Sequence, residues 1–141
     1  MILANLIWPS IIILGALYSW YIILVGLIIE TIAAHLFIKT GWLRSLGIMF
    51  VVNAISALIG LIFIPLSGIM VEVLTLPFGG GTFHISHWIL DYLMVIVVNT
   101  LIEGLSLKWI FKYQFKKNFW WLFGANAISV IISIVSFLPQ L

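Results

Sequence analysis

Residues 43–64 read LRSLGIMFVVNAISALIGLIFI, and Arg44 is their only charged residue. An apolar run of this length predicts a helix that crosses a lipid bilayer. The tetrapeptide NAIS within it, at residues 53–56, recurs at residues 126–129. The run therefore predicts that the chain lies in a lipid bilayer and that it contains an internal repeat.

Three more apolar runs lie at about residues 10–38, 87–111 and 119–138. Pro65 is expected to end the run at 43–64, and the connection at about residues 66–87 is apolar enough to predict a re-entrant or interfacial segment. We therefore expect one all-α integral membrane domain over residues 1–141, with four transmembrane helices. They form two tandem helical hairpins, at about residues 10–65 and 88–138.

The composition agrees with a membrane environment. Hydrophobic residues make up 65% of the 141 residues, charged residues only 7%, and the mean hydropathy is +1.32. A soluble domain carries roughly a quarter charged residues. These values exclude an aqueous enzyme and a nucleic-acid partner, and the chain has no cysteine for a disulfide scaffold. We expect membrane lipid around the chain and no enzymatic activity.

The basic residues predict the orientation of the chain. All six lie in or beside the two short turns that join the first to the second and the third to the fourth apolar run: Lys39, Arg44, Lys108, Lys112, Lys116 and Lys117. Cytoplasmic loops carry an excess of Lys and Arg. Both turns are therefore expected in the cytoplasm and both termini outside, in a prokaryotic cell membrane.

Shifting the chain by 73 positions aligns its two halves without a gap. The shift pairs Glu30 with Glu103, Lys39 with Lys112, and the NAIS tetrapeptide at 53–56 with that at 126–129. Each unit holds two spans, so the two units have the same orientation. We expect them to be related by a pseudo-two-fold axis along the membrane normal.

The repeat predicts a polar layer inside the membrane. In each hairpin 23 residues separate Glu from Asn, with the turn midway, so both lie roughly 10–15 Å from the turn at a rise of about 1.5 Å per residue. Glu30, Asn53, Glu103 and Asn126 are therefore expected at one depth. Two carboxylates there cannot both ionise without a counter-charge, so the layer predicts a cation or proton site.

In this site the Asn side chains are expected to contribute oxygen ligands to a hard cation. The alternative is that each Glu hydrogen-bonds an Asn and only holds the helices together. Serines at helical spacing predict a polar path from the layer toward the outer surface: Ser56, Ser129, Ser133 and Ser136.

Histidines give two further candidates. His84, His87 and Asp91 follow i, i+3, i+7 spacing near the outer end of the third span, a pattern that can hold a divalent metal, with Glu72 as a fourth ligand. Apart from that metal, no cofactor is expected. His35, one turn from Glu30, is either a proton relay or an interfacial side chain.

The sequence thus predicts a small integral membrane transporter or channel-like protein. Four helices of this size enclose little space, so we expect a homodimer or a subunit of a larger membrane complex. The alternative function is a non-catalytic subunit or assembly factor of a membrane protein complex, in which the same polar layer joins helices.

Overall fold

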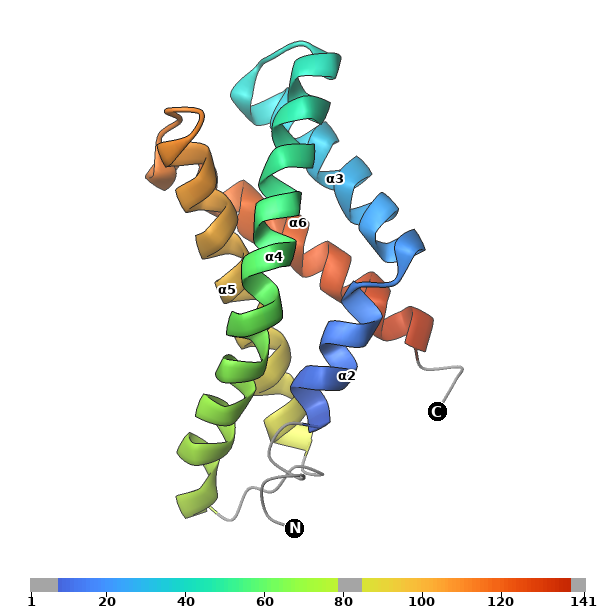
Figure 1. The fold of residues 1–141 in the computed structure, drawn as a ribbon, viewed down its shortest axis with the longest axis vertical. Helices are drawn as coiled ribbons and strands as arrows, with labels where there is room; N and C mark the ends of the chain where they lie inside the picture. Colours follow the sequence, from blue (N-terminus) through green and yellow to red (C-terminus); the bar gives the residue numbers. More distant parts are fainter. Residues whose placement is uncertain (1–7, 79–84, 138–141) are drawn as a thin grey trace.

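The structure is a computed structural model that describes residues 8–78 and 85–137, and the regular secondary structure in these ranges is helical (Figure 1). The elements are α2 (Trp8–Leu17), α3 (Trp20–Ile38), α4 (Trp42–Thr75), the short 3-10 helix η1 (Leu76–Phe78), α5 (Ile85–Trp109) and α6 (Phe115–Phe137). Four of them, α3 to α6, are long and apolar enough to cross a membrane. These four helices indicate an integral membrane protein.

The four long helices form a ring in which each packs against two neighbours. The α3–α4 and α5–α6 contacts lie within the two hairpins, and the α4–α5 and α3–α6 contacts join one hairpin to the other. The two short turns lie at the same end of the bundle (Figure 1). Lys39 and Lys112, 73 residues apart in these turns, are the non-glycine residues with left-handed backbone in the described ranges, with φ of 60° and 61°.

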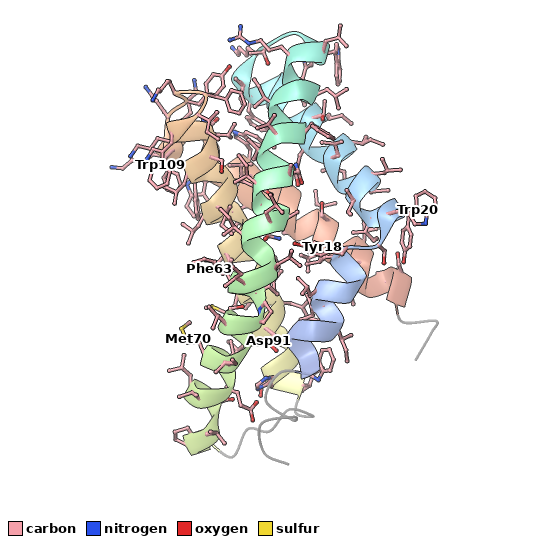
Figure 2. The ribbon with its side chains drawn as sticks, in the orientation of Figure 1. Tyr18, Trp20, Phe63, Met70, Asp91 and Trp109 are labelled. Atoms are coloured by element: carbon pink, nitrogen blue, oxygen red, sulfur yellow. The ribbon has the colours of Figure 1, made fainter. Side chains whose placement is uncertain are left out.

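Large apolar side chains cover the outside of the bundle. Phe63 and Met70 on α4 and Trp109 on α5 project away from it, and each is about half exposed or more (Figure 2). Such a surface is favourable in hydrocarbon and unfavourable in water. The prediction of a chain solvated by lipid agrees with this surface.

The first span is not one helix, as the apolar run at 10–38 predicts, but two. α2 ends at Leu17 and α3 begins at Trp20, because Ser19 has extended backbone with φ −64° and ψ 131°. α2 packs against α4, α5 and α6, and the Tyr18 hydroxyl donates a hydrogen bond to the Ala57 carbonyl of α4. This contact between Tyr18 and α4 lies at the break.

The second span passes through Pro65, where the sequence predicts its end. α4 continues for ten residues to Thr75, so much of the predicted connection at 66–87 is regular helix. Proline is tolerated inside a membrane helix when nearby groups bond the freed backbone. The carbonyl that Pro65 leaves without its helical N–H donor is that of Leu61, and α4 continues through this position. Ser67 donates its hydroxyl to the neighbouring Ile64 carbonyl at 2.7 Å. The third and fourth spans agree with the prediction to within a few residues.

Two apolar clusters fill the bundle. One lies toward the turns and contains Met49, Val52, Leu107 and Leu122. The other lies farther along the same helices and contains Ile13, Ile64, Val95 and Val130. The predicted polar layer lies between these two clusters.

Candidate polar site

The predicted Glu–Asn layer consists of two hydrogen-bonded pairs. Asn53 of α4 donates its side-chain N–H to Glu30 of α3, and Asn126 of α6 donates to Glu103 of α5 at 2.6 Å. Glu30 and Glu103 are 3% and 2% exposed, so these carboxyl groups face the interior of the bundle. Each bond joins the two helices of one hairpin.

The orientation of both amides is fixed by a second bond. Asn53 also donates to the Met49 carbonyl at 2.9 Å, and Asn126 donates to the Leu122 carbonyl at 3.1 Å. A backbone carbonyl only accepts, so the amide nitrogen must face it. The same nitrogen faces the carboxyl group in each pair. The expected role of Asn oxygens as ligands of a cation held by the same carboxyl groups is therefore not favoured by this geometry.

Ser56 connects the two pairs. It lies on α4 of the first hairpin, and its side chain interacts with Glu103 of the second. Glu30 is close enough to Glu103 for the two carboxyl groups to interact electrostatically. A low-dielectric interior penalises two negative charges at this separation. The layer thus favours a state with a shared proton or a bound cation.

All four predicted residues line one cavity of about 270 Å³. Its walls come from α3, α4, α5 and α6 and from the α2–α3 break. Eight lining residues are polar: Tyr18, Glu30, Asn53, Ser56, Asn99, Glu103, Asn126 and Ser129. The other eleven are apolar, and no basic residue is among the described residues that line it.

Tyr18 and Asn99 line the cavity as well, although neither is among the predicted site residues. Both approach α4 at Gly60, where a Cβ atom would lie 3.5 Å from the Tyr18 hydroxyl and 3.9 Å from Asn99 Oδ1. Tyr18 points from the break toward α4 (Figure 2). Asn99 lies four residues before Glu103, so the sequence places both on one face of the third span. For Tyr18 the only signal is a hydroxyl inside an apolar run.

The predicted serine path is only partly at the cavity. Ser56 and Ser129 line it, and Ser129 lies against Gly26 of α3, at 3.3 Å from an ideal Cβ there. Ser133 and Ser136 are not among the lining residues. Ser133 is buried, and Ser136 donates to the Ile132 carbonyl of its own helix at 2.8 Å.

The outer candidate metal site has a different geometry from the one that spacing predicts. His84 lies outside the described residues. His87 is fully buried between two carboxyl groups, with Nδ1 3.1 Å from Glu72 and Nε2 3.4 Å from Asp91. Because the two ring nitrogens point in different directions, these carboxyl groups lie on different sides of the ring. In the described part of the chain, no three His, Asp or Glu side chains converge on a metal.

His35 is held at the first turn. Its Nδ1 lies 2.6 Å from the Thr40 carbonyl, and its ring stacks on Trp42 at 4.0 Å between centroids. These contacts fix the geometry of the turn and favour the interfacial interpretation over the proton relay.

Comparisons with protein-family models, with curated proteins and with solved structures found no match.

Proposed function

We propose that the chain is a small membrane transporter or channel-like protein whose cation or proton site is the cavity between Glu30 and Glu103. One observation carries this proposal: two buried carboxyl groups, predicted from a repeat, line the same cavity with their Asn partners. Ionisable groups inside a membrane are costly, and they commonly mark ion and proton pathways.

The amide geometry favours a proton over a metal ion. Asn53 and Asn126 present N–H groups to the carboxyl oxygens. N–H donors repel a metal cation but are compatible with a carboxyl group that gains and loses a proton. The pair Glu30 and Glu103 would then hold one proton between them in the resting state.

The helix break supports a transport role. Transporter sites are commonly lined by interrupted helices, whose irregular backbone faces a cavity. The α2–α3 break meets this description, because Leu17 and Tyr18 both line the cavity.

The proposal includes the duplication and the orientation. The equivalent Asn-to-Glu and Asn-to-backbone bonds and the left-handed Lys39 and Lys112 support a tandem repeat. The six basic residues at one end of the bundle support cytoplasmic turns, with both termini outside a prokaryotic cell membrane.

The test is flux into liposomes that contain the purified protein and an internal pH-sensitive dye, under an imposed membrane potential. We expect proton flux from the wild type and none from the Glu30→Gln, Glu103→Gln variant. Glu72→Gln is the matched control, because it removes a buried carboxyl group that does not line the cavity. Equal flux from wild type and the double variant would falsify the transport proposal.

The second candidate is a subunit or assembly factor of a membrane complex. The exposed apolar side chains along α4, which include Phe63 and Met70, favour it because they could equally face another protein. It predicts a stoichiometric partner after gentle solubilisation of native membranes, together with no flux from the isolated chain. A homodimer that transports protons alone would rule it out.

A further inference from the structure

The cavity reaches the outer surface of the bundle between α3 and α4. Among its lining residues are Ile23 and Leu24 of α3 and Phe50 and Ala54 of α4, and all four are exposed. Phe50 alone is 62% exposed. The two helices diverge away from their turn (Figure 1). The cavity therefore has a buried acidic end and an open apolar end.

The open end faces the region where lipid is expected. The exposed residues next to it on the two helices are apolar, among them Ile28 and Leu58. Both helices are candidate membrane spans. A molecule dissolved in the bilayer could thus reach Glu30 and Glu103 without crossing an aqueous phase.

The walls are suited to an amphiphilic cation. Of the nineteen described residues that line the cavity, eleven are apolar, two are acidic and none is basic. The volume of about 270 Å³ is roughly nine times the share of one water molecule in the liquid, far more than a proton needs. The aromatic rings of Tyr18 and Phe50 can also contact a quaternary ammonium group.

We infer that the cavity binds an amphiphilic organic cation, with its charged head at the Glu30–Glu103 end and its apolar part leaving between α3 and α4 toward the bilayer. This inference rests on the proposed function, since it names a ligand class for the same site. It is narrower than that function, because proton flux does not require it.

The probes are benzyltrimethylammonium, its dodecyl analogue benzyldimethyldodecylammonium, and neopentylbenzene, the neutral isostere of the first. Binding is measured as equilibrium uptake of radiolabelled probe by the protein in lipid nanodiscs. Partition into lipid is measured on nanodiscs without protein and subtracted, and each probe is also measured on the Glu30→Gln, Glu103→Gln variant.

We expect saturable binding of both cations and none of the neutral isostere. The Glu30→Gln, Glu103→Gln variant should bind both cations more than about tenfold more weakly, because the attraction between the cation and the buried carboxylates is lost. The long-chain probe should bind at least as well as the short one, since its tail lies outside the cavity. If the cavity were closed toward the bilayer, the dodecyl probe would not bind.

A second pair of variants tests the opening. Ala54→Trp places a bulky ring at the open end of the cavity between α3 and α4. It should weaken binding of the dodecyl probe by at least about tenfold through steric exclusion. Leu58→Trp is the control, because Leu58 is 69% exposed on the same helix and does not line the cavity. It should change binding by less than about twofold, as surface substitutions usually do. Size-exclusion profiles and circular dichroism verify that each variant is folded.

The outcomes separate this inference from the proposed function. Carboxylate-dependent proton flux without saturable cation binding overturns the ligand class and leaves the transport proposal standing. Equal binding of the neutral isostere overturns recognition by charge. Full binding of the dodecyl probe to Ala54→Trp overturns access between α3 and α4. Absence of any flux counts against the proposed function instead.

Discussion

Asn126 and Glu103 are joined by a 2.6 Å hydrogen bond across 23 residues of sequence, and both side chains are almost fully buried. Asn53 and Glu30 have the same relationship at the same sequence separation. In both pairs the amide also bonds its own helix one turn earlier. Each carboxyl group is thus held by a side chain whose own orientation is fixed.

A double-mutant cycle on Glu103 and Asn126 should show favourable coupling. Glu103→Gln, Asn126→Ala and the double variant are compared by reversible unfolding in mixed micelles. We expect a coupling free energy of about 0.6–2 kcal/mol, the range found for hydrogen bonds between membrane helices. Zero coupling would mean that the 2.6 Å contact does not contribute to stability.

Gly104→Ala should destabilise the bundle. A Cβ atom at Gly104 would lie 2.7 Å from Cε2 of Phe115, so the ring must shift. Overpacking of this kind costs about 1–3 kcal/mol of unfolding free energy.

Gly124→Ala is the matched control for Gly104→Ala, because no atom lies within 4 Å of a Cβ atom there and the residue is helical. We expect it to be neutral or to stabilise by up to about 1 kcal/mol through helix propensity. Thermal denaturation in one detergent compares the two. The interpretation fails if both variants shift the transition equally.

Tyr18→Phe should destabilise α2 packing by about 0.5–1.5 kcal/mol, the net value of one hydrogen bond. The variant keeps the ring but removes the hydroxyl that donates to the Ala57 carbonyl. Hydrogen exchange is the measurement, and amides of Trp8–Leu17 should exchange faster while those of α5 do not change. Unchanged hydrogen exchange in α2 would show that the aromatic ring of Tyr18, without its hydroxyl, is sufficient to keep α2 packed.

His87→Leu should be among the most destabilising substitutions in the chain. It leaves Glu72 and Asp91 buried, at 5% and 1% exposure, without the imidazole between them. Removing one partner of a buried ionic group costs about 3–5 kcal/mol.

The combined variant Glu72→Gln, His87→Leu, Asp91→Asn should recover much of that loss, because it leaves no unpaired charge in the cluster. Unfolding free energies at pH 7 test both variants. If His87→Leu alone has wild-type stability, the contacts of His87 with Glu72 and Asp91 are not structurally important.

The sequence allowed prediction of the four spans and of the Glu–Asn layer because both depend on spacing along regular helices. It did not reveal the break after Leu17, since no glycine or proline lies there and the extended Ser19 accompanies a tertiary contact of Tyr18 with α4. Pro65 misled the prediction because proline is tolerated inside membrane helices, and α4 continues through it to Thr75. The sequence also placed His87 and Asp91 on one face and named Glu72 as a further ligand. Only the packed structure shows that Glu72 and Asp91 lie on different sides of the His87 ring.

The 34 residues of α4 give it a length of about 51 Å at 1.5 Å per residue. The hydrocarbon layer is about 30 Å thick, and even a tilt of about 40° leaves α4 spanning roughly 39 Å along the membrane normal. One end of this helix must therefore project into the headgroup layer. With the turns at the proposed cytoplasmic boundary, the projecting end of α4 carries Glu72, whose partner His87 lies on α5. Bilayer thickness then determines how deeply this cluster is immersed, so the chain should respond to lipid acyl length at that end first.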